Sequence, residues 1–234
     1  MSTIPLNLQA VRQQIAQAAQ TAGRLPSEID LLVVSKTFDA HAVLQAVHAG
    51  QTAFGENYLQ EALDKMHVIA ELAPELALEW HFIGPVQSNK TRQIAENFSW
   101  VHAVDRLKIA LRLSEQRPDH LPPLNICLQV NISGETSKSG VSPDQIAELA
   151  VQIAALPRLR LRGLMAIPEP VPVLEQQRLP YRQMKQLQDQ LSRQGLALDT
   201  LSMGMSSDLT AAILEGSTLV RVGSAIFGKR DYAK

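Results

Sequence analysis

Short apolar runs alternate along this chain with longer segments of helical period, and the alternation continues to the C-terminal region. Alternating strands and helices indicate parallel strands joined by crossover helices. Eight such runs in 234 residues predict an α/β fold built as a single closed (β/α)8 barrel, a TIM barrel. The predicted strands are residues 30–36, 52–57, 78–84, 100–105, 124–132, 159–167, 200–205 and 219–228.

Helix boundaries support this pattern. The opening segment, MSTIPLNLQAVRQQIAQAAQ, has the apolar spacing of an extra amphipathic helix before the first strand. Asp39, Ser142 and Asp208 are placed to cap later helices at their N-terminal ends. Gly50 and Gly216 are placed to end helices in the left-handed conformation. A doubly wound open sheet is the alternative, but no G-x-G-x-x-G follows the first strand to support a dinucleotide site.

Composition limits the classes of function. We expect one domain over residues 1–234, because no linker divides the chain and the Pro-rich stretch 166–180 reads as one rim loop. A net charge of −1 gives no attraction to nucleic acid or anionic membrane, and no apolar run is long enough to span a bilayer. The N-terminus lacks the pattern of a secretory signal. A single cysteine, Cys127, reads as a buried small hydrophobe and suits a reducing, cytoplasmic compartment.

The first predicted strand, DLLVVSK, ends in a lysine. In (β/α)8 barrels the site lies at the C-terminal ends of the strands. Lys36 would therefore reach into the barrel mouth over an apolar floor, unless its amine extends to solvent. The second strand ends in Glu56 and Asn57 at the same edge.

The last two strand ends carry small and hydroxyl residues. Backbone N–H groups and hydroxyls at a glycine turn bind anions, and the loops after strands seven and eight of such barrels often hold a phosphate. Helix capping alone is the alternative for the serines. The predicted phosphate-binding residues are Ser206, Ser207, Gly223 and Ser224.

A desolvated lysine opposite a phosphate pocket suggests a phosphorylated aldehyde held as a Schiff base. Burial disfavours the ammonium form and exposes the nucleophilic amine. Pyridoxal 5′-phosphate (PLP) has both features. A phosphosugar aldolase would have them too, so the pattern alone leaves both ligands open.

Five motifs in register carry a resemblance to a known family. VSKT, FGENYLQE, WHFIGPVQSNK, MGMSSD and RVGSAIFG together resemble the pyridoxal phosphate homeostasis proteins, single-domain relatives of the N-terminal barrel of alanine racemase (fold type III of the PLP proteins). One departure is Val86, where leucine is expected. The resemblance implies Lys36 as the residue of the internal aldimine, Asn57 beside the ring and Arg221 facing the pyridine nitrogen. The alternative for Arg221 is an inward barrel residue paired with a carboxylate such as Glu56.

The resemblance also implies a PLP carrier or buffer rather than an enzyme. An arginine only donates hydrogen bonds, so it would keep the ring nitrogen unprotonated and a poor electron acceptor. Racemisation needs a second base, which in racemases comes from a further domain that we expect this chain to lack. Tyr58 and Tyr181 read as packing residues, and Tyr232 lies in the tail. We expect a monomer that meets apo-enzymes only transiently; a low-activity amino-acid racemase is the alternative.

The remaining polar residues have simpler interpretations. Segment 131–140 reads as a rim loop in which Lys138 could meet phosphate, although a solvated lysine is the simpler reading. His81 and His102 lie within predicted strands and read as hydrogen-bonded core histidines. No histidine spacing suits a metal, so none is predicted.

Overall fold

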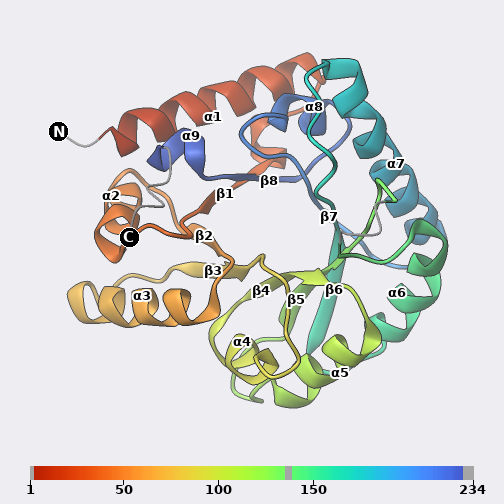
Figure 1. The fold of residues 1–234 in the computed structure, drawn as a ribbon, viewed down its shortest axis with the longest axis horizontal. Helices are drawn as coiled ribbons and strands as arrows, with labels where there is room; N and C mark the ends of the chain where they lie inside the picture. The colour runs from red at the N-terminus through yellow and green to blue at the C-terminus, as the bar shows by residue number, and fades with distance from the viewer. Residues whose placement is uncertain (1–2, 135–138, 229–234) are drawn as a thin grey trace.

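The computed structural model describes residues 3–134 and 139–228. Eight parallel strands close into one barrel in which each strand pairs with its neighbours in the sequence and the last pairs with the first (Figure 1). The predicted (β/α)8 barrel is therefore confirmed. The strands are β1 (Asp30–Val34), β2 (Ala53–Glu56), β3 (Glu79–Phe82), β4 (Trp100–Val104), β5 (Leu124–Gln129), β6 (Leu159–Met165), β7 (Thr200–Ser202) and β8 (Leu219–Val222).

Helices surround the strand ring on its outside (Figure 1). The extra N-terminal helix α1 (Ile4–Thr21) packs against α2, α8 and α9. The other helices are α2 (Ala40–His48), α3 (Leu59–Leu72), α4 (Thr91–Asn97), α5 (Leu107–Gln116), α6 (Ile146–Ala154), α7 (Leu174–Arg193), α8 (Leu209–Leu214) and α9 (Ser224–Phe227), with 3₁₀ turns at Pro26–Glu28 and Pro143–Gln145.

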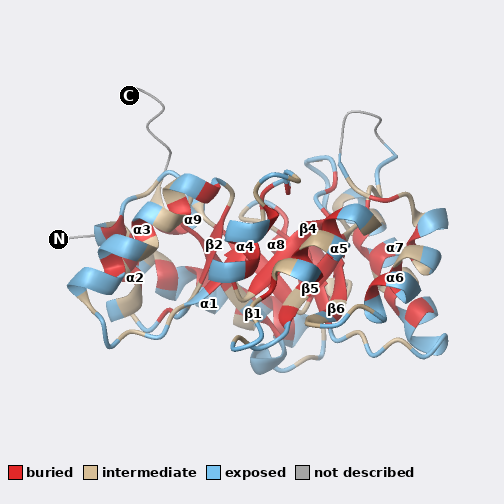
Figure 2. Cartoon of the chain, turned by 90° about the horizontal axis from the view of Figure 1, so that it is seen from below, coloured by how far each residue is buried: buried red, intermediate tan, exposed pale blue. Residues whose placement is uncertain are grey.

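The strands are mostly buried, and β4 is buried along its whole length, whereas the surrounding helices also carry many exposed residues (Figure 2). One apolar cluster joins the outward faces of the strands to the inner faces of the helices. Inside the barrel, Cys127 packs in a second cluster with Trp100, Ala103 and Met165. Burial raises the pKa of the Cys127 thiol to about 12, so this cysteine is the inert small hydrophobe that the sequence predicted.

The predictions of helix ends were confirmed at Asp39, Gly50 and Gly216 and were wrong at Asp208. Asp39 caps α2 by accepting a hydrogen bond from the Ala42 N–H at 2.9 Å. Gly50 and Gly216 have φ of +81° and +95°, as predicted for helix ends. Asp208 precedes α8, but its carboxylate accepts from the Met205 N–H and the Tyr181 hydroxyl instead of capping the helix.

Several predicted boundaries were wrong. The Pro-rich stretch 166–180 was predicted as one loop, but α7 begins at Leu174 and contains Pro180. The fifth and seventh predicted strands ran to residues 132 and 205, but β5 ends at Gln129 and β7 at Ser202.

The eighth predicted strand ran to residue 228, but β8 ends at Val222 and α9 occupies Ser224–Phe227. The apolar run continues because α9 buries Ile226 under α1, so hydrophobicity alone could not show the change of structure. Ser142 begins a 3₁₀ turn without a side-chain cap, and α6 starts only at Ile146.

Among the described residues, no helix combines the length and apolar character needed to cross a bilayer.

Candidate functional site

A cavity of about 300 Å³ lies at the C-terminal ends of the strands. Its apolar wall comes from Val34, Ile83, Ile167 and Met205. Ile167 is exposed at its edge, so the cavity opens to solvent. The structure brings every residue predicted for the cofactor to this one cavity: Lys36, Asn57, Ser206, Ser207, Arg221, Gly223 and Ser224.

Lys36 lies in the turn directly after β1 and is half-buried. The next residue, Thr37, has φ of +69°, a left-handed conformation that is unfavourable for a β-branched residue. The Thr37 N–H donates to the Glu61 carboxylate at 2.6 Å. The backbone that presents Lys36 is therefore held in a strained shape by a contact from α3.

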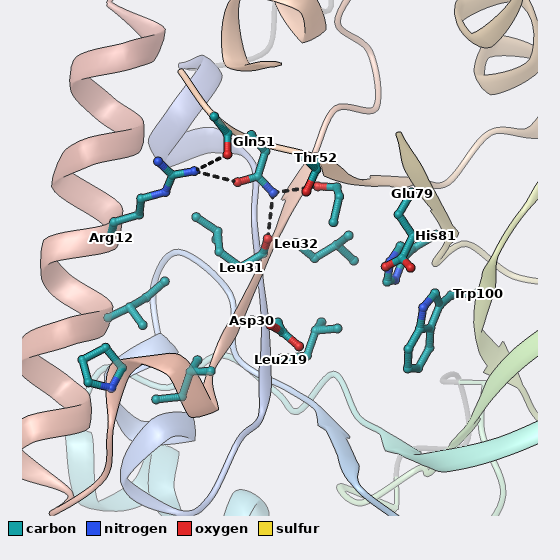
Figure 3. A pocket seen from close by; sticks show the side chains of 15 residues that line it. Arg12, Asp30, Leu31, Leu32, Gln51, Thr52, Glu79, His81, Trp100 and Leu219 are labelled. Atoms are coloured by element: carbon teal, nitrogen blue, oxygen red, sulfur yellow. Dashed lines mark hydrogen bonds and ion pairs between the residues drawn. The ribbon is translucent and has the colours of Figure 1, made fainter. Parts of the chain in front are cut away.

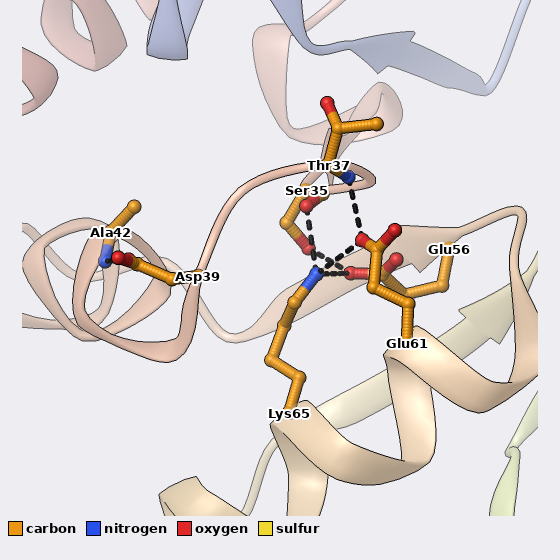
Figure 4. A network of polar contacts seen from close by, with 7 residues as sticks. All are labelled: Ser35, Thr37, Asp39, Ala42, Glu56, Glu61 and Lys65. Carbon is orange, nitrogen blue, oxygen red and sulfur yellow. Dashed lines mark hydrogen bonds and ion pairs between the residues drawn. The ribbon is translucent and has the colours of Figure 1, made fainter. Parts of the chain in front are cut away.

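A buried ion pair lies under this turn (Figure 4). Lys65 Nζ on α3 donates to Ser35 O at 2.8 Å, to Glu56 Oε1 at 2.5 Å and to Glu61 Oε1 at 3.2 Å. The Ser35 hydroxyl donates to the same Glu56 oxygen at 2.6 Å. These contacts join the end of β1, the end of β2 and α3, so they fix where the Lys36 turn sits.

Glu56 is fully buried in this network. Burial raises the pKa of its carboxyl, and the contacts from Lys65 and Ser35 offset only part of that rise. Its Oε2 atom is buried and has no hydrogen-bond partner within the described chain. A charge buried this way is costly unless its partner stays in place, so Lys65 and Glu56 depend on each other.

Hydroxyl groups also line the cavity. Ser206 and Ser207 follow β7, and Ser224 follows β8. The Ser224 hydroxyl donates to Ser206 Oγ at 3.3 Å, so the two loops converge. At Gly223 a Cβ atom would lie 2.9 Å from the Val34 carbonyl oxygen, so no larger residue fits against β1 without a shift.

Arg221 projects from β8 into the barrel and is 4% exposed. Its guanidinium donates from Nη1 to Ser202 Oγ at 2.7 Å and from Nη2 to Ala166 O at 3.0 Å. The alternative pairing of Arg221 with Glu56 was wrong, because Glu56 pairs with Lys65. Burial lowers the pKa of Arg221, yet an arginine remains protonated.

Asn57 follows β2 and passes close to the backbone after β3. A Cβ atom at Gly84 would lie 2.3 Å from the Asn57 carbonyl oxygen, so glycine is required there. The Asn57 Oδ1 atom is buried, and nothing in the described part of the chain donates a hydrogen bond to it. A buried amide oxygen in this state, at the edge of a cavity, is a candidate ligand contact.

A larger cavity, about 470 Å³, lies at the other end of the barrel, where the strands begin (Figure 3). Arg12 reaches it from α1 and donates to Ala49 O, Gly50 O and Gln51 Oε1. The Gln51 amide in turn donates to Leu31 O and Ala53 O, each at 2.9 Å. Asp30, Glu79, His81 and Trp100 complete the wall.

Sequence reasoning missed Lys65, which bonds to Ser35 and Glu56 beneath the turn that carries Lys36. A signal was present in the sequence: Lys65 falls on the face of α3 that buries Leu59, Ala62 and Ile69. A lysine that interrupts an apolar stripe at helical spacing needs a buried carboxylate, and Glu56 is the one that lies within reach.

Some predictions fall outside the described residues. Lys138 and Tyr232 both lie there, and their roles stay predictions.

Tyr181 is buried and donates to Asp208 at 2.8 Å, while Tyr58 is exposed at the start of α3. Both fit the packing and surface roles that the sequence predicted. His81 and His102 are hydrogen-bonded in the core, as predicted.

Comparison with known families gives one consistent match. Residues 6–231 match the model of the alanine racemase N-terminal domain. A protein of Vibrio cholerae named pyridoxal phosphate homeostasis protein is 56% identical over 100% of this chain and 99% of its own length. Its namesake in Pseudomonas aeruginosa is 60% identical over 99% of this chain and 98% of its own length.

Solved structures give the same match. PipY of Synechococcus elongatus without PLP is 36% identical and covers 96% of this chain and 100% of its own, with a TM-score of 0.85. The structure of PipY with PLP bound has a TM-score of 0.79 and covers 92% of this chain and 100% of its own.

Proposed function

Because this chain belongs to the pyridoxal phosphate homeostasis protein family, whose barrel is that of the alanine racemase N-terminal domain, we propose that it binds PLP as a Schiff base on Lys36. The amine of Lys36 adds to the aldehyde and water leaves, which gives a reversible covalent bond. The observation that carries the proposal is the convergence of Lys36, Arg221 and the serine loops on one solvent-open cavity.

The cavity fits the chemistry of this cofactor. Ser206, Ser207 and Ser224 supply hydroxyl donors for a phosphate, and Gly223 lines the same cavity. Asn57 supplies a buried oxygen that lacks a donor elsewhere in the described residues, and a ring hydroxyl could provide one. Val34 and Ile83 supply apolar surface for the ring.

Arg221 is proposed to face the pyridine nitrogen. Its two hydrogen bonds use one N–H from each terminal nitrogen, so further donors remain on the guanidinium. The bound cofactor supplies an electron sink only when its ring nitrogen is protonated or paired with an acid. A buried, permanently charged donor at that position opposes ring protonation, so we infer that the protein carries PLP without catalytic turnover.

A carrier role follows from the open cavity and the reversible bond. Another amine can reach the bound aldehyde from solvent and displace Lys36, which delivers the cofactor to an apo-enzyme or limits free aldehyde. We further infer a cytoplasmic monomer formed by a single domain over residues 1–234, without affinity for nucleic acid or membrane. Sedimentation velocity of the full chain tests the monomer.

The site is tested by reductive trapping. Wild-type protein with PLP is expected to show a visible absorption band and, after borohydride treatment, a pyridoxyl label on Lys36. Lys36→Ala should lose both. Lys108→Ala is the matched control, because Lys108 is an exposed lysine on α5. A label that stays on another lysine in the Lys36→Ala protein would refute the site.

Carrier and racemase are separated by two measurements. Excess of a competing amine should remove PLP from the wild-type protein, and a cofactor that resists it would refute the carrier. Incubation with L-alanine or D-alanine should leave the optical rotation unchanged. Clear racemisation by pure protein would establish the racemase alternative instead.

A further inference from the structure

A continuous row of polar side chains crosses the barrel interior from one cavity to the other. Glu79 Oε1 lies 2.7 Å from His81 Nε2, and His81 Nδ1 lies 2.9 Å from His102 Nε2. His102 Nδ1 lies 2.8 Å from Ser202 Oγ, which is 2.7 Å from Arg221 Nη1. His102 and Ser202 are on β4 and β7, which are not neighbours in the sheet, so the row runs through the centre of the barrel.

The two ends of this row fix the direction of every hydrogen bond in it. Arg221 can only donate, and a carboxylate such as Glu79 can only accept. Ser202 therefore accepts from Arg221 and donates its hydroxyl hydrogen to His102 Nδ1. His102 then donates from Nε2 to His81 Nδ1, and His81 donates from Nε2 to Glu79. Both histidines are neutral in this arrangement, and each carries its hydrogen on Nε2.

The surroundings favour these neutral forms. His81 and His102 are 2% and 0% exposed, and burial is the main cause that lowers the pKa of each. Glu79 and Asp30 face His81 and oppose that shift in part. Among the described residues, the charged groups that act on His102 are His81 and Arg221, and both lower its pKa further.

A proton added to His81 would reverse the row. His81 would then donate from Nδ1 to His102 Nε2, and His102 would have to donate from Nδ1 to Ser202. The Ser202 oxygen would receive hydrogen bonds from both His102 and Arg221, and its own hydrogen would lose its acceptor. Every hydrogen-bond donor in the row therefore has an acceptor only when both histidines are neutral.

We propose that Ser202, His102, His81 and Glu79 are positioning residues that hold the Arg221 guanidinium at the floor of the C-terminal cavity, and that Glu79 is the end of the row that meets the N-terminal cavity. The link to PLP rests on the proposed function, since it assumes that Arg221 faces the cofactor.

Arg221 needs such support because, within the described residues, no carboxylate bonds to its buried guanidinium, and the charge of Asp208 acts on it without a hydrogen bond. Within the described residues, its hydrogen-bond acceptors are a hydroxyl and a backbone carbonyl, both neutral. Buried charges are normally paired. The row of hydrogen bonds that starts at Arg221 reaches a carboxylate at Glu79, with three side chains in between. Without Ser202 the guanidinium has one acceptor fewer. Without one of the other members, the orientation of the Ser202 hydroxyl is no longer fixed.

The first test needs no cofactor. In ¹⁵N-histidine NMR of the cofactor-free protein at pH 7, His81 and His102 should both appear as neutral Nε2–H forms. Ser202→Ala should change the signals of His102. Ser217→Ala is the matched control, because Ser217 is a fully buried serine just before β8 whose hydroxyl bonds to backbone carbonyls. A charged ring, or a neutral Nδ1–H form at either position, would overturn the proposal.

The second test measures PLP affinity by titration of the visible band. Ser202→Ala should weaken binding about threefold to tenfold, the effect of one ordinary hydrogen bond. It should also shift the pH dependence of the band, while Ser202→Thr restores both and Ser217→Ala changes neither. Glu79→Ala should weaken binding more than Glu79→Gln, because the glutamine oxygen can still accept from His81. Wild-type affinity and pH profile in folded Ser202→Ala would overturn the proposal.

The two tests separate this inference from the proposed function. If Lys36 carried no label in the wild-type protein, the proposed function would fail, whereas the histidine signals would still decide whether the row exists. Circular dichroism of each variant confirms that it is folded before its affinity is compared.

Discussion

The two ends of the barrel carry cavities of different size and different chemistry. The N-terminal cavity is larger, about 470 Å³ against about 300 Å³, but the polar side chains of Arg12 and Gln51 there are committed to backbone carbonyls. These contacts join α1 to the β1–β2 connection. The smaller C-terminal cavity has a lysine on a strained turn, converging hydroxyls and a buried amide oxygen without a donor in the described chain.

On the proposed assignment, a buried Asn57 oxygen without a donor in the described chain marks the smaller cavity as the binding site, and volume is not the deciding property. At the N-terminal end the polar groups hold elements together. At the C-terminal end the supporting network of Lys65, Glu56 and Glu61 lies behind the Lys36 turn and leaves the cavity wall to other residues.

The largest effect that tests this difference is on stability. Lys65→Met should lower the free energy of unfolding by about 3–5 kcal/mol, because it leaves the buried Glu56 carboxyl without its partner. Arg12→Met at the other end should cost only about 1 kcal/mol, because Arg12 is exposed and bonds to carbonyls that water can reach. Urea denaturation of both variants measures the contrast.

The matched control for that experiment removes both charges. Lys65→Met combined with Glu56→Gln should recover most of the stability lost by Lys65→Met alone. A double variant as unstable as the single one would show that packing, not the unpaired carboxylate, causes the loss.

The second effect is on ligand affinity. Ser206→Ala should weaken PLP binding by roughly 1.5–3 kcal/mol, tenfold or more, because a hydroxyl that bonds a charged phosphate is lost. Thr52→Ala removes a hydroxyl from the N-terminal cavity and should leave the affinity unchanged. Equal losses in the two variants would contradict the assignment of the cofactor to the C-terminal end.

A smaller effect should appear in the pH dependence of stability, through the histidines between the two cavities. Burial lowers the pKa of His81 and His102 in the folded protein, so below about pH 6.5 the unfolded chain binds more protons than the folded one. Stability is therefore complete above that pH and falls as the solution is acidified. By pH 5 the loss is at most about 2 kcal/mol for each histidine.

Thermal unfolding between pH 7.5 and 5 measures this slope. His102→Gln should flatten it, whereas His67→Gln should not, because His67 is 75% exposed on α3. An unchanged slope in His102→Gln would show that other groups cause the acid sensitivity.

The smallest effect concerns backbone strain at the two ends. Thr37 at the C-terminal end and Arg158 at the N-terminal end, just before β6, have φ of +69° and +61°. Thr37→Gly should stabilise the protein by up to about 1 kcal/mol, since glycine relieves the strain but loses more entropy on folding. Arg158→Gly should gain less, because Arg158 is not β-branched and also pairs with Asp119.

The PLP affinity of Thr37→Gly sharpens the comparison further. If the strained turn presents Lys36, affinity should fall although stability rises. A variant that gains both would show that the strain has no role in binding.

The sequence was sufficient for the order of elements and for the residues around the C-terminal cavity. Strand alternation, helix period and the residue types at strand ends are local properties, and a parallel barrel brings all strand ends to one rim. Lys36, Asn57 and Arg221 could therefore be grouped from one sequence. Their individual roles in binding stay predictions.

Only the tertiary structure decided how those residues are supported. The Lys65–Glu56 pair joins a helix to a strand, and His102 meets Ser202 across 100 positions in the sequence. The end of β8 likewise depends on α1, which covers α9 and buries Ile226. These contacts form only when distant segments pack at one depth of the barrel, and local periodicity contains no information about that depth.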